Sequence, residues 1–431
     1  MTVTGSVNAS TRIHSKDWVP KASVYVVPMK TPDDVSGLDE LLQRGSICAS
    51  DVVAMVAKAD GTGLADDPQR GIVEQTLRAW MIRVIPSLAD EPYQDIPVIV
   101  SAGCPRPLIP NVTIFTQRWL CRNQFNDSLV DGLVIGTATM PIILSKDIGR
   151  LEHIRVATQA TLAAMAYAGI TDPAQVRAVV AKGPSLSQHD IDYANDRGID
   201  LVTYELSMGP NGCVSIANDA VALGIGYALD ELPSASKIFA SGSFRRDRTL
   251  SSTRAFVSSA GEKRNGDVVV LGMRSDTVSN VRVGLGMSGW TGDSQGLLDA
   301  LVDAGLDLDS EAISGYPSQV IQAFAKYSAP IRVDGLPQLE RAMLNSQTQM
   351  PYPSLGDAQA GKHTDKSWDP SDHVKAKAVG AGMIATATGL VATFVSGGEH
   401  TCHNGPEGGG PVAVFVRTPL AVSTDQLGET S

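Results

Sequence analysis

The sequence predicts an α+β fold in which three homologous units surround a central site with pseudo-threefold symmetry. Three apolar runs end in Ala-Lys, and a second set of three apolar runs ends in Ser, a small residue and Gly. The two kinds of run alternate along the chain, so one motif pair occurs three times. Strand-like and helix-like segments also alternate within each copy, as they do in α+β and α/β layers. The pairs are Lys58 with Ser101, Lys182 with Ser259, and Lys326 with Ser396.

Domain-sized lengths of chain separate the lysines, far more than the roughly 20–50 residues of a solenoid repeat. We therefore expect three large units around a shared axis. Their predicted bounds are 21–121, 128–275 and 276–420, with a flexible N-terminal arm at 1–20 and a tail at 421–431.

Unit one is expected to begin with the β-branched strand Ser23–Pro28 and to reach a buried strand at Pro97–Ser101. Helical spacing of apolar residues predicts helices at Asp34–Arg44 and Ile72–Ile85. Unit two shows the same alternation, with strands at Leu129–Thr137 and Val268–Gly272 and helices at Gly149–Ala168, Ser187–Arg197 and Ser215–Asp230.

Unit three is expected to begin near Thr277–Gly286. Its predicted helices are Ser294–Ala304, Gln338–Ser346 and Ala376–Thr388. The polar, glycine-containing segment Ser354–Asp372 shows no clear period and is interpreted as a loop insertion.

Composition narrows the class of protein. Hydrophobic residues make up 43% and charged residues 19% of the 431 residues, as in a soluble globular protein. The net charge of −11 argues against nucleic acid or an anionic membrane as a partner. No apolar run reaches the roughly 18–20 residues of a membrane span, and the N-terminus lacks the pattern of a signal peptide. Five scattered cysteines suggest no disulfide framework, so we expect a cytoplasmic protein.

The serine and lysine pairs indicate nucleophilic chemistry. A neutral amine near a serine can remove the hydroxyl proton, and burial or a neighbouring ammonium keeps a lysine neutral. The glycine-containing turn after each serine can supply N–H donors for an oxyanion, which suits acyl transfer at an amide carbonyl. Alternatively, each serine only starts a tight turn and each lysine only reaches solvent at a strand end.

With these stretches, the chain resembles the cyanuric acid amidohydrolase/barbiturase family of ring-opening amidohydrolases over about 22–418. The most specific motif is Ser396-Gly-Gly-Glu-His, followed by Gly405-Pro-Glu-Gly-Gly-Gly-Pro411. The resemblance implies the Toblerone fold, homotetramers, and an acyl-enzyme formed at Ser259 with Lys182 as its base. It further implies that each unit grips the ring with a serine, the next residue and an arginine. The other expected substrate-binding residues are Ser101, Ala102, Ala260, Ser396, Gly397, Lys58 and Lys326.

The arginine positions depart from the family pattern. They fall on Arg70, Asn218 and Lys377, so an amide and a point charge replace two guanidinium groups. Three unequal clamps favour an unsymmetrical, barbiturate-like ring over cyanuric acid. Cyanuric acid is the alternative substrate, and a non-catalytic small-molecule binder on the same fold is the second alternative.

The resemblance also raises the question of a metal. Family members can hold a structural divalent cation with a glutamate whose position is Ser328 here. The loop at 399–411 instead contains His400, Cys402 and His403, which could bind zinc with a fourth ligand from His363, His373 or Asp372. Local loop contacts without metal are the other reading, because His-x-Cys-His is not a standard zinc spacing. We expect that catalysis itself requires no cofactor.

Overall fold

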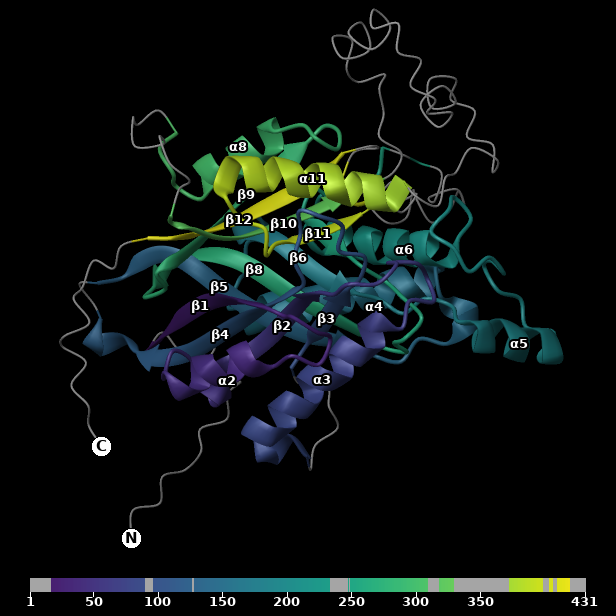
Figure 1. The fold of residues 1–431 in the computed structure, drawn as a ribbon, viewed down its shortest axis with the longest axis horizontal. Helices are drawn as coiled ribbons and strands as arrows, with labels where there is room; N and C mark the ends of the chain where they lie inside the picture. Colours follow the sequence, from purple (N-terminus) through teal and green to yellow (C-terminus); the bar gives the residue numbers. More distant parts are fainter. Residues whose placement is uncertain are drawn as a thin grey trace, which may run out of the picture.

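The computed structural model describes residues 17–89, 96–125, 128–232, 247, 249–308, 318–328, 372–397, 403–405 and 409–418. Three four-stranded sheets form its centre, and Figure 1 shows them side by side with helices on the outside. Among the described helices, none is long and apolar enough to cross a membrane.

The three sheets share one strand order, in which the last strand of each unit lies between its first two strands. The first and fourth strands pair antiparallel, and the second and third pair parallel. The strands of unit one are β1 (Trp18–Pro28), β2 (Val52–Lys58), β3 (Val98–Ser101) and β4 (Asn111–Cys121). Unit two contains β5 (Val130–Met140), β6 (Val176–Lys182), β7 (Ala255–Val257) and β8 (Gly266–Thr277). Unit three contains β9 (Val281–Ser288), β10 (Val320–Tyr327), β11 (Phe394–Gly397) and β12 (Gly410–Arg417).

The repeat extends to an irregularity in the backbone. The second strand of every sheet shifts register against the fourth strand near its start, between Val52 and Ala54, Val176 and Ala178, and Val320 and Gln322. Each shift precedes the lysine at the end of its strand by the same number of residues. Register shifts of this kind bend a strand and re-aim its side chains, so the three lysines leave their sheets in equivalent ways.

Helices cover the outer face of each sheet (Figure 1). Unit one has α2 (Ser36–Gln43) and α3 (Gln69–Val84), and unit three has α8 (Gln295–Asp303) and α11 (Asp372–Thr388). Unit two has α4 (Leu151–Tyr167), α5 (Gln188–Arg197) and α6 (Cys213–Ala228). Short side chains let α4 and α6 approach closely, since a Cβ on Gly224 would lie 2.5 Å from the Cβ of Ala157.

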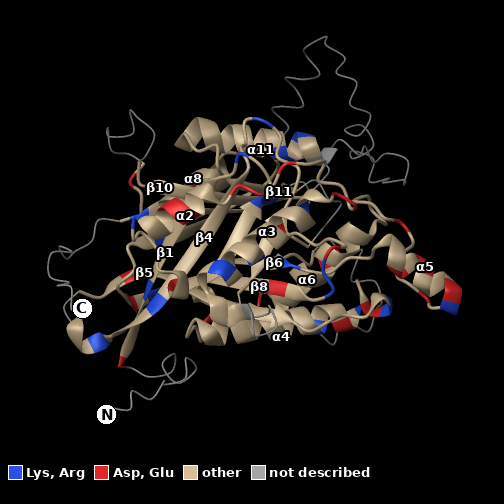
Figure 2. Cartoon of the chain, turned by 60° about the horizontal axis from the view of Figure 1, so that its bottom comes forward, with Lys and Arg blue, Asp and Glu red and all other residues tan. Residues whose placement is uncertain are grey.

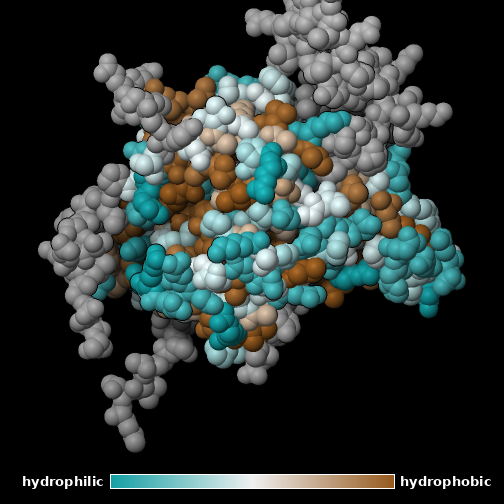
Figure 3. Space-filling model, viewed as in Figure 1, coloured by the Kyte–Doolittle hydropathy of each residue, from teal (hydrophilic) through white to brown (hydrophobic). Residues whose placement is uncertain are grey.

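The inner faces of all three sheets share one hydrophobic core. Phe115 of unit one, Phe256 of unit two and Phe324 of unit three belong to this single buried cluster. Separate clusters fill the space between each sheet and its own helices. Charged residues lie mainly on the helices and loops in Figure 2, whereas Figure 3 shows a hydrophilic surface around α5.

The structure changes one predicted boundary. Residues 18–20 do not belong to a flexible arm, because β1 begins at Trp18 and pairs with β4 along its whole length, from Trp18 opposite Cys121 to Pro28 opposite Asn111. The remaining unit boundaries stay predictions. The predicted helix Gln338–Ser346, the loop 354–371, the tail 421–431, and His363, His400 and Cys402 lie outside the described residues.

Candidate active site

The lysines of the three units meet at the short segment from Val100 to Ala102. Lys58 Nζ donates to Ser101 Oγ at 3.3 Å and to the carbonyl oxygen of Ala102 at 2.9 Å. Lys182 Nζ of unit two donates to the carbonyl oxygen of Val100 at 3.0 Å. In unit three, Lys326 Nζ donates to Ser396 Oγ at 3.4 Å, and Ser396 Oγ lies 3.4 Å from Ser101 Oγ. All these side chains are buried, so the end of β3 is the point where the three units converge.

Strand register identifies which serine of unit two is equivalent to Ser101 and Ser396. Lys58 lies opposite Ser101 and Lys326 lies opposite Ser396 in their parallel strand pairs. In unit two, Ala181 lies opposite Val257, and the bridge between Pro184 and Ala260 keeps the same register. The residue opposite Lys182 is therefore Ser258.

Ser259, the serine expected from the sequence, instead faces the opposite side of the strand. Successive side chains alternate between the two faces of a strand, so Ser259 shares a face with Gly183. A Cβ built on Gly183 would lie 2.8 Å from Ser259 Oγ and 3.3 Å from Nε2 of His153. Ser259 Oγ is buried and has no hydrogen-bond partner among the described residues. In this register Ser258 is equivalent to Ser101 and Ser396, and Ser259 occupies the place of Ala102 and Gly397.

A partly exposed carboxylate accompanies the unit-two lysine. Lys182 Nζ lies 2.6 Å from Glu262 Oε1, and the second carboxylate oxygen lies 3.4 Å from Nε of Arg70. Burial lowers the pKa of Lys182, and Arg70 lowers it further, whereas Glu262 raises it. Burial alone would raise the pKa of Glu262, but Lys182 and Arg70 together hold that pKa below its ordinary value. The lysine is therefore easier to deprotonate than an exposed one, although it is paired with an anion.

Arg70 on α3 borders the site and also holds a loop in place. Its Nη2 donates to the carbonyl oxygens of Leu64 and Ala65, at 2.5 and 2.9 Å. Gly63, at the start of this loop, has a φ of +74°, a conformation that glycine adopts without steric cost.

Lys377 on α11 reaches from unit three into unit one. Its Nζ donates to the carbonyl oxygen of Ala102 at 3.2 Å, so Lys58 and Lys377 share one acceptor. A Cβ on either Gly63 or Gly103 would lie 2.9 Å from this Nζ. Both glycines are therefore needed to let the ammonium approach the backbone.

Asn218 on α6 binds the backbone of the turn that carries the two serines of unit two. Its Oδ1 accepts the backbone N–H of Ser259 at 2.6 Å, and the described residues that line the cavity do not include it. Ala260 also differs from expectation, because its N–H donates to the carbonyl oxygen of Gly183 at 3.2 Å. Both residues hold the turn that follows Ser258.

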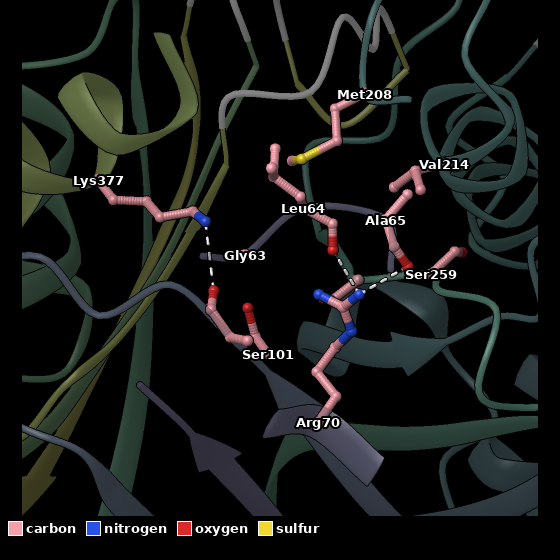
Figure 4. Close-up of a pocket in the computed structure, with 11 residues that line it drawn as sticks. Gly63, Leu64, Ala65, Arg70, Ser101, Met208, Val214, Ser259 and Lys377 are labelled. Carbon is pink, nitrogen blue, oxygen red and sulfur yellow. Dashed lines mark hydrogen bonds between the residues drawn. The ribbon is translucent and has the colours of Figure 1, made fainter. Parts of the chain in front are cut away.

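A small cavity lies between these groups. Figure 4 shows Lys377 and Arg70 on two sides of it, with Ser101 between them. Its lining combines residues of all three units, including Ser101, Ala102, Ser258, Ser259, Arg70 and Lys377. A small planar ring with several carbonyl groups matches this arrangement of hydroxyl and cationic donors.

Several described groups around the candidate metal loop are hydrogen-bonded to other protein groups. At the glutamate position, the hydroxyl of Ser328 donates to the carbonyl oxygen of Gly409 at 3.2 Å, so a direct hydrogen bond connects the strand end to the glycine-rich loop. The ring Nδ1 of His403 is hydrogen-bonded to the carbonyl oxygen of Leu250, and the backbone of His403 accepts the N–H of Ser252. Within the described ranges, no three His, Cys, Asp or Glu side chains are grouped to hold a metal.

Three sheet units of one strand order thus bring their lysines together around the end of β3, beside a cavity that residues of all three units line. The amidohydrolase ring-opening protein family matches residues 23–347 and 351–417, and the chain belongs to this family. The chain is 35% identical over 398 residues to a cyclic amide hydrolase of Pseudofrankia inefficax, covering 92% of this chain and 95% of the relative. It is 30% identical to barbiturase 1 of a Nocardioides species, covering 91% and 98%. The crystal structure of cyanuric acid hydrolase from A. caulinodans superposes with a TM-score of 0.73 and 27% identity, covering 93% of this chain and 99% of that one.

Proposed function

We propose that this protein opens a cyclic amide, imide or ureide ring by hydrolysis through an acyl-enzyme, with Ser258 as nucleophile and Lys182 as base. The observation that carries the proposal is the strand register, which places Ser258 opposite Lys182 as Ser101 lies opposite Lys58. In this mechanism, neutral Lys182 accepts the hydroxyl proton while the Ser258 oxygen attacks a ring carbonyl. The lysine then gives the proton to the leaving nitrogen, and water releases the acyl group by the same path in reverse. The other serine and lysine pairs hold the remaining carbonyls and fix the orientation of the ring.

The residues at the three arginine positions of the family support a preference for unsymmetrical rings. Arg70 and Lys377 border the cavity, whereas Asn218 is bonded to the backbone of Ser259. A guanidinium, an ammonium and an amide that is bonded to the backbone cannot bind three identical carbonyl groups equally well. We therefore propose that barbiturate-like rings are better substrates than cyanuric acid.

A substrate panel tests this proposal. Cyanuric acid, barbiturate, hydantoins, dihydropyrimidines and cyclic imides are incubated with the protein, and loss of the ring is followed by absorbance. We expect the highest kcat/KM for a barbiturate-like ring, and the same turnover after chelation, because serine and lysine supply the chemistry. A higher kcat/KM for cyanuric acid than for every other ring would reject the substrate assignment. Turnover abolished by chelation with the fold intact would reject metal independence, and binding of rings without turnover would favour the non-catalytic binder.

Serine variants test the nucleophile. Ser258→Ala should lower kcat by several orders of magnitude, as loss of a nucleophile does in other hydrolases. Ser259→Ala should keep most of the turnover, since its hydroxyl faces Gly183. Ser101→Ala and Ser396→Ala should mainly affect KM. Intact-mass and peptide mapping of a trapped acyl adduct locates the reacting oxygen, and an adduct on Ser259, Ser101 or Ser396 would contradict the assignment.

A homotetramer and a cytoplasmic location remain predictions. Light scattering after size-exclusion chromatography measures the first, and fractionation of the source cells measures the second.

A further inference from the structure

Glu262 lies between the buried base and a second hollow of the protein. Its carboxylate contacts Lys182, whose side chain is 0% exposed, yet the side chain of Glu262 is itself 17% exposed. A surface groove is lined by Glu262, by Glu74, Arg78 and Ala79 of α3, and by Arg264. Among the described residues that line the central cavity, neither Lys182 nor Glu262 occurs. Glu262 therefore links Lys182 to the groove and not to the substrate cavity.

The proposed reaction creates a proton that must leave this buried region. When water cleaves a ring imide or ureide, the carbonyl carbon becomes a carboxylic acid and the nitrogen becomes an amide or urea group. The acid ionises near neutral pH, whereas the amide or urea nitrogen takes up no proton. For a ring that enters in its neutral form, one proton is thus released in each turnover, from the new carboxylic acid. Lys182 is neutral again once the serine has regained its proton, and it lies opposite Ser258 in the paired strands, so it can accept the proton of the product acid.

We propose that Glu262 and the groove form the proton exit of Lys182, an inference that rests on the proposed ring-opening function. Neutral Lys182 takes the proton of the product carboxylic acid, and the resulting ammonium transfers it to the Glu262 carboxylate, which gives it to water in the groove and returns to its anionic state. Lys182 is left neutral for the next attack by Ser258. The carbonyl oxygen of Val100, 3.0 Å from Lys182 Nζ, fixes the amine while its proton is exchanged.

The surroundings of Glu262 suit this exchange. Arg70 and Lys182 keep the carboxylate anionic at rest, so a proton does not remain on it. Farther along the groove wall, Glu74 pairs with Lys263 at 3.0 Å and with Arg78 at 2.9 Å. Lys263 also pairs with Asp267, and Arg78 lies 3.9 Å from the same carboxylate. These ion pairs make the wall beside Glu262 polar and able to hold water.

Chemical rescue tests the exit. Glu262→Ala should lower kcat about 10²-fold, within the range of general acid–base groups. Formate at about 0.2 M should then raise the kcat of this variant at least about tenfold, because it replaces the missing carboxylate. Glu262→Gln should move the acidic limb of the kcat/KM profile to lower pH, because the carboxylate that raises the pKa of Lys182 is gone. A purely structural role would not give the rescue.

A blocked groove separates this route from access through the central cavity. Ala79→Trp fills the exposed groove position on α3, and Ile72→Trp is the matched control because Ile72 is 44% exposed on the same helix outside the groove lining. Adding Ala79→Trp to Glu262→Ala should abolish formate rescue, whereas adding Ile72→Trp should preserve it. Rescue that survives Ala79→Trp would overturn the groove as the route, and near-normal kcat in Glu262→Ala would overturn the role of the carboxylate.

A readout without substrate distinguishes this inference from the proposed function. Formate should raise the Tm of Glu262→Ala but not of the wild type, and Ala79→Trp should remove the effect. If formate stabilises Glu262→Ala in this way while the wild type opens no ring, the groove leads to Lys182 and the proposed reaction is wrong. If the wild type opens rings but formate neither rescues nor stabilises the variant, the proton exit is wrong and the reaction stands.

Discussion

At the scale of single residues, a buried histidine lies behind the turn that carries the two serines of unit two. His153 is 0% exposed, and its Nδ1 accepts the backbone N–H of Gly149 at 3.1 Å. The ring proton of the neutral form therefore resides on Nε2, which has no partner among the described residues. Burial lowers the pKa of His153 to about 3. His153 is thus a neutral buried side chain, and protonation of its ring would destabilise the folded protein.

This histidine should make the folded protein sensitive to acid. The unfolded chain binds a proton at His153 below about pH 6.5, whereas the folded chain does so only near pH 3. The contribution of His153 to stability is therefore present above pH 6.5 and is lost as the pH falls toward 3, by up to about 1.4 kcal/mol per pH unit. His153→Gln keeps an acceptor for Gly149 without a titrating group, so its urea-unfolding free energy should fall less steeply over this window. His189→Gln, at an exposed histidine, is the control, and equal slopes in the wild type and His153→Gln would contradict the prediction.

At the scale of elements, strand β7 shows where sequence reasoning reached its limit. The recurring lysine strands and serine turns predicted three equivalent sheets, and the common strand order confirms the fold. Aligning the units by Ser-Ala-Gly selected Ser259, but pairing of β7 with β6 selects Ser258. Register depends on hydrogen bonds between distant strands, which a short turn motif does not determine. Unit two has two adjacent serines, Ser258 and Ser259, so its turn could be aligned with the turns of the other units in two ways.

Gly183, at the exit of β6, tests the packing of this element. Its backbone has no left-handed strain, yet a Cβ there would lie 2.7 Å from Cγ2 of Val221 and 2.8 Å from Ser259 Oγ. Gly183→Ala should cost about 1–3 kcal/mol in unfolding free energy, as overpacking does, and should lower kcat because the Ser258 turn must shift. Gly382→Ala on α11 is the matched control, since nothing lies within 4 Å of its Cβ position. That substitution should stabilise the helix by up to about 1 kcal/mol. A fully active, equally stable Gly183→Ala protein would show that the turn tolerates displacement.

At the scale of the whole molecule, the three units are joined by one interior. Gln117 of unit one exchanges two hydrogen bonds with the backbone of Ile135 in unit two, at 2.7 and 2.8 Å. The backbone N–H of Val257 in unit two donates to Asn404 Oδ1 of unit three at 3.3 Å. The cavity is lined by residues of all three units, so a single unit contains only part of it. The sequence repeat predicted the convergence of the lysines but could not show that Asn218 turns toward the backbone, because that contact depends on how α6 packs against β7.

Phe324 connects the sheets at the centre of this interior, which makes it a test of whether the units unfold together. Its ring lies 6.1 Å from that of Phe115 in unit one and 5.1 Å from that of Phe415 in its own unit. Phe324→Ala should lower the unfolding free energy by about 3–5 kcal/mol through the cavity it leaves. The loss falls on the shared core, so far-UV circular dichroism should still coincide with tryptophan fluorescence in one transition. Both Trp80 of unit one and Trp290 of unit three contribute to this fluorescence. Leu297→Ala, in the cluster between the unit-three sheet and its helices, provides a comparison in which only unit three is directly affected. If unit one kept its transition while unit three melted earlier in Phe324→Ala, the units would be independent domains, and the cavity between them would open before the chain unfolds.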